Sequence, residues 1–378
     1  MAMDLAIVGT WNFRDPNKGI AVFRYDRKTG NMEPLEHIDH WVSAGQQCFN
    51  HKRNVLYVVD ECDGKPDTRG GGGFARAYHV DPETGKLTFL NEIGVLMTKP
   101  AYICLNSTGE YALVACHTGG NPITKVARDG AGNWFSTVMY EDAGIVLLHL
   151  NSDGSFDRVS DVVLHDGWAC NAKVAHAHLH SIVASPDGEL FYACDKGLDR
   201  VYAYKIHHAS GKLLRMTEQV MPPLTAPRYS VFHPTLPVLY ENNETSPEVY
   251  AFHYDPKSGA LEIINAVNTY APEENGSPSD LQIHPSGKYL YAAVRKLNKL
   301  VVLRTDDQTG AVTIIQEVDN PGAPRGMAVS PDGRFLLVAN NDTACVCRYA
   351  IAEDGRLTLR EGTVSVPNAA NIGILFFD

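Results

Sequence analysis

The sequence has no long apolar run, no clustered cysteines and no excess of basic residues. No apolar stretch approaches the roughly 18 residues that a membrane-spanning helix requires, and the short run Leu5–Val8 after Asp4 does not resemble a signal peptide. The 33 Lys and Arg residues are outnumbered by 44 Asp and Glu residues, and the net charge is −11. This charge disfavours nucleic acid and anionic membranes as partners. We therefore expect neither kind of partner and no membrane segment.

The cysteines are scattered, which argues against a zinc site. They are Cys48, Cys62, Cys104, Cys116, Cys170, Cys194, Cys345 and Cys347. In a strand, Cys345 and Cys347 would share one face, and this is not the spacing of a zinc knuckle. Buried free thiols suit a reducing compartment. We therefore expect a cytoplasmic protein with no resident metal and no cofactor.

The chain does contain two short motifs that recur. The first is a Thr-Gly, Ser-Gly or Asp-Gly turn followed by a strand. Its seven glycines are Gly30, Gly85, Gly154, Gly211, Gly259, Gly310 and Gly355. Each copy follows a run in which side-chain character alternates, as in Val249–Tyr254, and this alternation is typical of a β-strand. The repeat therefore has a period of about 50 residues, the size of one propeller blade.

The second motif is a turn of the Pro-Asp-Gly type followed by an apolar strand, as in Ser185–Gly188 and Ser330–Gly333. Such turns supply the backbone conformations that a tight hairpin needs. Together the two motifs give four strands per repeat, which predicts an all-β, seven-bladed β-propeller with four-stranded antiparallel blades. Only six full copies of the second motif occur, so we expect strands from both termini, Asn371–Phe377, Leu5–Val8 and Gly19–Tyr25, to complete the last blade. Residues 1–378 then form a single domain.

The predicted strand order brings polar residues of six blades to one face of the disc. In an up-and-down blade, the loop before the innermost strand and the loop after the second strand open on the same face. These loops carry carboxylates, imidazoles, guanidiniums and amides: Asp60, Glu61, His117, His178, His180, Asp195, Arg228, Glu241, Glu244, Arg295, Arg325 and Asn340. The opposite face receives mainly turns. The sequence thus predicts a site at one mouth of the central channel.

These residues lie in phrases that resemble the seven-bladed lactonase family, which includes the propeller-type 6-phosphogluconolactonases and the fungal 3-carboxy-cis,cis-muconate lactonizing enzyme. The phrases occur in family order over the whole chain: Val8–Thr10, Leu56–Glu61, His180–Ile182, Asp195–Arg200, Ala226–Arg228, Phe232–Pro234, Glu244, Val294–Arg295 and Gly322–Arg325. The resemblance implies a lactone hydrolase or a lactonizing cycloisomerase. Its substrate would be a small anionic or sugar-derived lactone or carboxylate.

The resemblance also implies a catalytic set, carried over position by position: His180, Arg228, Glu244 and Arg295. A histidine suits acid–base work near neutral pH, and arginines can hold a carboxylate or phosphate and offset oxyanion charge. We assign His180 and Glu244 as complementary acid and base, and Arg228 and Arg295 as substrate clamps. We further assign four residues to substrate binding: His117, His178, Arg325 and Glu61.

The chain departs from the family pattern at three places. His176 is an additional histidine, residues 117–142 form a long loop in blade two, and Gly70–Gly73 belong to an insertion in blade one. The glycine run lacks a following Lys-Ser or Lys-Thr and is therefore no phosphate-binding loop. We expect both insertions on the face that carries the site, where they would narrow it.

Other interpretations of the same residues stay open. His176 can simply bond a neighbouring backbone group, Arg325 can brace a neighbouring acid, and Asp60, Glu61 and Asp195 can tie blades together. His176, His178 and His180 would share one side of a strand, which allows a metal-dependent lactonase. A non-catalytic propeller that binds a peptide or protein on this face is a further alternative, although the sequence has no Trp-Asp dipeptide. The sequence gives no oligomeric state.

Overall fold

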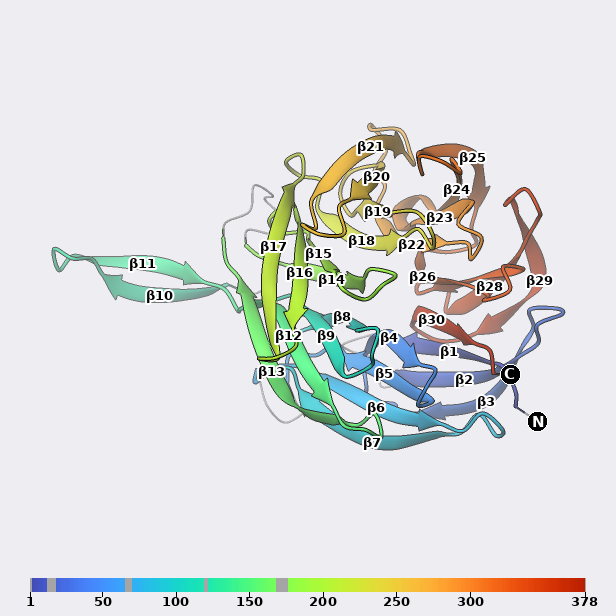
Figure 1. The fold of residues 1–378 in the computed structure, drawn as a ribbon, viewed down its shortest axis with the longest axis horizontal. Coiled ribbons are helices and arrows are strands. Elements are labelled where there is room, and N and C mark those ends of the chain that lie inside the picture. The colour runs from blue at the N-terminus through green and yellow to red at the C-terminus, as the bar shows by residue number, and fades with distance from the viewer. Residues whose placement is uncertain (1, 12–17, 65–69, 119–121, 168–175, 378) are drawn as a thin grey trace.

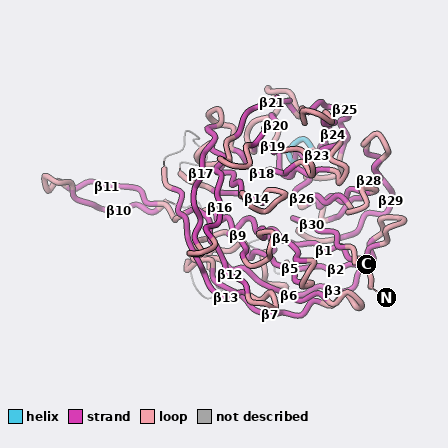
Figure 2. The backbone as a smooth tube through the Cα atoms, in the orientation of Figure 1, coloured by secondary structure: helices cyan, strands magenta, loops and turns pink. Residues whose placement is uncertain are grey.

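The strands of this protein form seven four-stranded antiparallel blades around a ring (Figures 1 and 2). The structure is a computed structural model that describes residues 2–11, 18–64, 70–118, 122–167 and 176–377. The predicted seven-bladed propeller is confirmed. Cys170 and part of the blade-one insertion lie outside the described residues. Among the described residues, no helix has the length and hydropathy needed to cross a bilayer.

Blades one to three follow one another along the chain. Blade one consists of β4 (Ala44–Asn50), β5 (Val55–Asp60), β6 (Phe74–Val80) and β7 (Leu87–Gly94). Blade two consists of β8 (Pro100–Leu105), β9 (Tyr111–Cys116), β12 (Ala143–Leu150) and β13 (Phe156–His165). Blade three consists of β14 (Leu179–Ala184), β15 (Phe191–Asp195), β16 (Arg200–His207) and β17 (Lys212–Val220). A separate hairpin, β10 (Ile123–Arg128) and β11 (Trp134–Met139), is inserted in blade two.

Blades four to seven complete the ring. Blade four consists of β18 (Pro227–Phe232), β19 (Val238–Asn243), β20 (Glu248–Tyr254) and β21 (Leu261–Asn268). Blade five consists of β22 (Pro278–Ile283), β23 (Tyr289–Val294), the short 3₁₀ helix η1 (Arg295–Leu297), β24 (Lys299–Thr305) and β25 (Val312–Asp319). Blade six consists of β26 (Pro324–Val329), β27 (Phe335–Asn340), β28 (Cys345–Ile351) and β29 (Leu357–Ser365). Blade seven consists of β30 (Ala369–Leu375), β1 (Leu5–Thr10), β2 (Gly19–Tyr25) and β3 (Met32–Ile38).

The two ends of the chain close the ring, as the repeat count predicts. β30 is the innermost strand of blade seven and pairs antiparallel with β1, Leu5 lying opposite Leu375. Asp4 accepts a hydrogen bond of 2.7 Å from the Arg27 guanidinium and another of 3.0 Å from the Phe377 backbone N–H. Arg27 also lies 4.0 Å from the ring centroid of Phe376. Closure therefore joins residues at opposite ends of the sequence and leaves no open sheet edge at the join.

The glycine of the first repeated motif serves two purposes. Gly259, in the turn between β20 and β21, has a φ of +76°, a backbone conformation that only glycine adopts without strain. Its N–H donates a hydrogen bond of 2.8 Å to the Asp255 carbonyl. Its own carbonyl accepts a hydrogen bond of 2.9 Å from the hydroxyl of Tyr192 in the preceding blade. The Tyr240 hydroxyl bonds Gly310 in the same way, at 2.9 Å. The turn glycines therefore fasten neighbouring blades, each bond contributing on the order of 1 kcal/mol.

Glu241 on β19 is an exception to the apolar packing between blades. Its side chain is fully buried, and neither carboxylate oxygen meets hydrogen-bond geometry with any of the described residues. Burial raises the pKa of this carboxyl well above its ordinary value. The folded protein therefore keeps a proton there that the unfolded chain releases above a pH of about 4.5, so stability falls as the pH rises through that region.

We expect Glu241→Gln to raise the free energy of unfolding at neutral pH, because glutamine removes this proton linkage while keeping the side-chain size. The gain over wild type should grow by up to about 1.4 kcal/mol per pH unit above the unfolded-state pKa. Urea unfolding at several pH values between about 5 and about 8 measures it. Glu262→Gln, an exposed carboxylate on β21, is the matched control. A gain that does not depend on pH would show that Glu241 is ionised in the folded protein.

Candidate functional site

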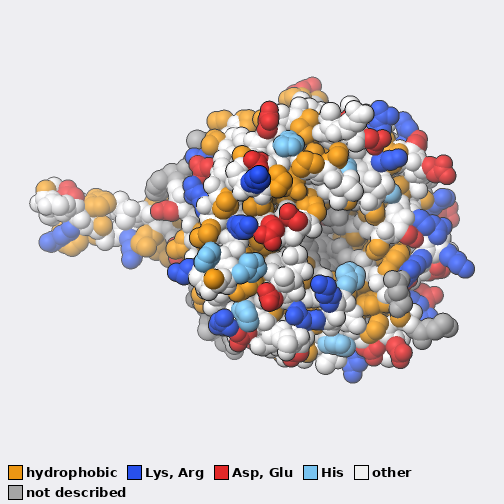
Figure 3. All heavy atoms as spheres, in the orientation of Figure 1, with side chains coloured by type: hydrophobic (Ala, Val, Ile, Leu, Met, Phe, Trp, Pro, Cys, Tyr) orange, Lys and Arg blue, Asp and Glu red, His pale blue; other side chains and the backbone are white. Residues whose placement is uncertain are grey.

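The candidate site lies where the innermost strands begin and the second strands of each blade end. The innermost strands of neighbouring blades, β14, β18, β22 and β26, lie next to one another around the channel. In the view of Figure 3 the disc is hollowed near its centre, and charged side chains of both signs lie around the hollow together with His side chains. Side chains from different blades therefore meet at this mouth.

Glu244 is at the centre of a cluster of cations. One of its carboxylate oxygens, Oε2, accepts hydrogen bonds from Lys196 Nζ at 3.1 Å and Arg228 Nε at 3.0 Å. The other, Oε1, lies 3.7 Å from a guanidinium nitrogen of Arg295. Burial acts to raise the pKa of Glu244, but the three cations outweigh it and hold the pKa well below its ordinary value. The charges around Glu244 therefore favour an ionised carboxylate at neutral pH, a form that accepts rather than donates a proton.

Arg228, the second residue of β18, is almost completely buried. Besides Glu244, its guanidinium contacts the backbone carbonyl of Ser279 in blade five, and it lies 4.6 Å from the ring centroid of Tyr229. Arg228 thus links blade four to blade five while presenting its charge to the cluster. A buried guanidinium so held is preorganised for an anion.

Arg295 comes from blade five and reaches the same cluster. It opens η1, directly after β23, and its guanidinium donates to the Ser277 hydroxyl at 2.9 Å and to the Pro278 carbonyl at 3.2 Å. Burial and the nearby Arg228 lower the pKa of Arg295 to about 9, so it remains a cation at neutral pH. Its position is fixed by backbone groups rather than by Glu244 alone.

Lys196 is the member of the cluster that sequence reasoning missed. It lies in the loop between β15 and β16, and the Asp195 carboxylate fixes this loop by accepting the backbone N–H groups of Gly197 and Leu198, each at 3.1 Å. Asp195 also accepts the backbone N–H of His178 at 2.8 Å. The only sequence signal was the position of Lys196 within the Asp195–Arg200 phrase, since most lysines in such loops are exposed.

His180 lies beside this cluster in a stack of three imidazoles. The ring of His117 is stacked on that of His178, with centroids 4.4 Å apart, and on that of His180, at 5.5 Å. Tyr229 packs edge-on against His180 at 5.2 Å. Burial, followed by the charges of Arg228 and Lys196, lowers the pKa of His180 well below its ordinary value. His180 is therefore a neutral imidazole at neutral pH.

Glu61 and Arg325 form the other side of the mouth. Glu61 lies 3.3 Å from the His117 Nε2 atom and 3.8 Å from a guanidinium nitrogen of Arg325. Arg325 in turn lies 4.0 Å from the ring centroid of Trp11. A side chain at Gly45 would bring a Cβ within 2.5 Å of the Glu61 carboxylate, so glycine leaves the space that this carboxylate occupies. The sequence-predicted residues of blades one, two and six thus lie in one connected group.

The three histidines His176, His178 and His180 do not share a strand face, contrary to the spacing argument. β14 begins at Leu179, so only His180 belongs to the strand. The Nε2 atom of His176 hydrogen-bonds the Thr118 hydroxyl at 2.5 Å, and its ring stacks on Tyr140 at 4.0 Å. Among the described residues, no three His, Cys, Asp or Glu side chains are grouped so as to hold a metal ion. His176 fastens the base of the hairpin instead.

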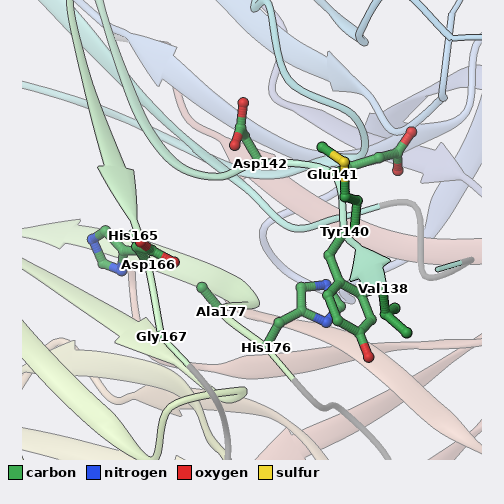
Figure 4. Close-up of a pocket in the computed structure, with 10 residues that line it drawn as sticks. Val138, Tyr140, Glu141, Asp142, His165, Asp166, Gly167, His176 and Ala177 are labelled. Atoms are coloured by element: carbon green, nitrogen blue, oxygen red, sulfur yellow. The ribbon is translucent and has the colours of Figure 1, made fainter. Parts of the chain in front are cut away.

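A separate pocket of about 240 Å³ lies at this hairpin base (Figure 4). Its lining includes Tyr140, Glu141, Asp166 and His176, and Figure 4 shows Tyr140 lying against His176. His165, which also lines it, is already bonded to Asp195 and Tyr204. None of Lys196, Arg228, Glu244 and Arg295 lines this pocket. The pocket is therefore separate from the cluster of cations around Glu244. The hairpin itself projects sideways from the ring (Figure 1), so it does not narrow the mouth as the long loop led us to expect.

Comparisons with known proteins agree over the whole chain. A family model described as "Lactonase, 7-bladed beta-propeller" matches residues 6–131 and 115–374. The 6-phosphogluconolactonase of Bacillus subtilis is 26% identical over 97% of each chain, and that of Formosa agariphila is 24% identical over 88% of each. The fold resembles the periplasmic gluconolactonase of Pseudomonas aeruginosa (TM-score 0.86, 25% identity, 99% of each chain) and a protein from Lactobacillus plantarum (TM-score 0.83, 21% identity, 99% of this chain and 100% of that one).

Proposed function

Because this chain belongs to the family of seven-bladed β-propeller lactonases, we propose that its channel mouth hydrolyses a small anionic sugar lactone of the 6-phosphogluconolactone type. The observation that carries the proposal is a buried neutral histidine, His180, next to a cluster with more cations than carboxylates. Lys196, Arg228, Arg295 and Arg325 face two carboxylates, Glu61 and Glu244. The surplus positive charge favours a substrate that carries a phosphate or carboxylate.

In the proposed reaction His180 acts as general base. Its neutral imidazole accepts a proton from a water molecule as the water oxygen attacks the lactone carbonyl. Arg228 and Arg295, the proposed clamps, stabilise the negative charge that develops on the carbonyl oxygen. When the ring C–O bond breaks, the imidazolium returns its proton to the departing alkoxide, so one water is consumed and a hydroxy acid is formed. Glu244 stays ionised and holds the cations in place.

His117, His178, Arg325 and Glu61 complete the proposed binding surface. His117, whose ring stacks on those of both His178 and His180, holds His180 on one side, and the Glu61–Arg325 pair offers a cation to a second substrate group. Ring closure of an unsaturated polycarboxylate is the second reaction that this arrangement supports, since arginines bind carboxylates as well as phosphates. A cytoplasmic location is part of the proposal and is supported by the seven unpaired cysteines among the described residues. Nothing in this set of residues requires a metal for the proposed steps.

The proposal is tested by measuring hydrolysis of freshly prepared 6-phosphogluconolactone and of neutral gluconolactone by the purified chain. We expect catalysis above the spontaneous rate, with kcat/KM at least about tenfold higher for the phosphorylated lactone, one charge-assisted contact contributing about 1.5–3 kcal/mol. Cyclisation of a carboxymuconate without lactone hydrolysis would support the second reaction instead. Failure of all three substrates to react would contradict an enzyme of this class.

Lys196 is proposed as a positioning residue that acts through Glu244. We expect Lys196→Met to lower kcat/KM by about tenfold to a hundredfold and to move the acid limb of its pH profile to higher pH. The shift goes to higher pH because the Lys196 charge lowers the pKa of His180 as well as that of Glu244, and its removal lets the general base be protonated at a higher pH. Lys196→Arg should restore both values in part.

The matched control for Lys196 is Lys299→Met, because Lys299 forms an ion pair with Glu317 on the outer strands of blade five, away from the mouth. We expect this variant to retain the wild-type profile. A Lys196→Met variant that loses activity without any change in its pH profile would contradict the positioning role and leave only a structural one.

A further inference from the structure

The hairpin of β10 and β11 is a sheet separate from the seven blades. It is a two-stranded sheet that pairs with no blade strand among the described residues, and it projects from blade two into solvent (Figures 1 and 2). We refer to residues 123–139 as the arm. At its tip the Asp129 carboxylate accepts hydrogen bonds from the backbone N–H groups of Ala131 and Asn133, both at 2.9 Å. These hydrogen bonds stabilise the turn between the two strands.

The arm exposes large apolar side chains on both faces. The exposed fractions are Ile123 62%, Val126 72%, Trp134 65%, Phe135 47%, Val138 42% and Met139 45%. The antiparallel register places Ile123 opposite Met139, and Thr124 opposite Val138. On both strands, therefore, the odd-numbered residues lie on one face of the arm and the even-numbered residues on the other. Figure 3 shows hydrophobic side chains along the projecting arm. At the base of the arm Val138 and Met139 line the pocket with His165 and Asp166 of the ring, whereas the rest of the arm projects away from the ring (Figure 1).

An isolated two-stranded hairpin is at best marginally stable in water, and three or more strands or a packed face are needed to stabilise it. The arm also has an unpaired backbone edge on each strand, which in most proteins is protected. The cation–π contact of Arg128 with Trp134, at 3.9 Å, contributes only about 0.5–1 kcal/mol at an exposed site. The arm therefore has the composition of a surface that is covered in the working protein.

We propose that the arm is a dimerisation element that associates with the arm of a second copy of this chain. A second copy related by a twofold axis presents the same apolar faces and unpaired strand edges. In such an isologous contact, each side chain that is buried on one copy is also buried on the other. Each face of the arm carries three of the six large apolar side chains, one of the three being aromatic. One face from each of two copies therefore supplies six such side chains to the core of an interface.

Charge also favours a second copy over a membrane as the occupant. The arm contains Lys125, Arg128 and one acid, Asp129, whereas the whole chain has a net charge of −11. A contact between two arms brings together only the small net charge of each arm, whereas a membrane contact would bring the acidic body close to an anionic lipid surface. The contact is independent of the proposed reaction, because no residue of the arm belongs to the channel mouth.

Sedimentation velocity of the full chain over a hundredfold range of concentration tests the proposal. We expect wild type to approach twice the 41.4 kDa chain mass, and at least one of Trp134→Lys and Phe135→Lys, which lie on opposite faces of the arm, to weaken dimerisation by about tenfold or more. In a deletion variant an Asn-Gly turn replaces residues 123–139, and we expect it to be monomeric. Because Ile123 and Met139 are register partners, this deletion joins chain ends that already lie close together.

The control is Leu359→Lys, which places the same charge at an exposed apolar residue of β29 in blade six; it should leave the dimer intact. Circular dichroism and lactone hydrolysis check that every variant retains the ring. A wild-type chain that stays monomeric, or a dimer that survives deletion of the arm, would overturn the proposal. So would arm-dependent binding of the monomer to phosphatidylcholine or phosphatidylserine vesicles, since the arm would then be a lipid contact.

Discussion

Replacing His180 by glutamine is expected to lower kcat/KM for lactone hydrolysis by about 10²–10⁴, the range found when a general base is removed. The structure gives the physical reason. His180 is buried against Tyr229 and the stacked ring of His117, and burial keeps its imidazole neutral. Glutamine keeps a polar side chain of similar length but cannot accept a proton at this pH, so we expect chemistry to be lost while the ring stays folded.

The pH profile of the wild type provides the second part of this test. Because the pKa of His180 lies well below its ordinary value of about 6.5, the neutral base persists as the pH falls through 6.5. We expect kcat/KM to hold to lower pH than an exposed histidine would allow and then to fall as the imidazole is protonated. A half-maximal rate near pH 7 would contradict a buried neutral base.

His176→Gln is the matched control, because it removes an imidazole only four residues away. His176 bonds Thr118 and stacks on Tyr140 at the base of the arm, so we expect activity within a few fold of wild type. If His176→Gln were as inactive as His180→Gln, and a tightly bound ion were lost with it, the metal-dependent alternative would be favoured.

Replacing Glu244 by glutamine is expected to lower both activity and stability. Three cations, Lys196, Arg228 and Arg295, lie within 3.7 Å of its oxygens, and removing the partner of a buried charge costs about 3–5 kcal/mol. We expect kcat/KM to fall by about 10³ or more, because the clamps lose the carboxylate that positions them. Urea unfolding and lactone assays measure the two effects.

An anion should partly rescue the stability of the Glu244→Gln variant. Inorganic phosphate can take the place of the missing carboxylate among the three cations, so we expect phosphate to raise its melting temperature by more than that of wild type. Glu317→Gln on the surface of blade five should show neither the loss nor the rescue. A Glu244→Gln variant as stable as wild type in the absence of added anions would mean that the cations are satisfied by other groups.

The residues that sequence reasoning placed correctly are those whose position follows from the repeat. Arg228 is the second residue of an innermost strand, and Arg295 directly follows a second strand, so the order of strands in a blade brings both to one mouth. Lys196 belongs to the same cluster but was not identified, because loop lysines are usually solvated and its burial depends on the neighbouring blade. The catalytic and binding roles of all these residues remain predictions.

The sequence by itself determined the number of blades, the four strands in each and the closure by both termini. These features depend on local alternation and on turn residues such as Gly259, which act within a few positions of the chain. Only the tertiary structure decided which charges meet. The ionised state of Glu244, the neutral state of His180 and the buried proton on Glu241 all follow from side chains of neighbouring strands or blades. Coulomb energies and desolvation depend on distance in space, and neither is encoded in the spacing of residues along the chain.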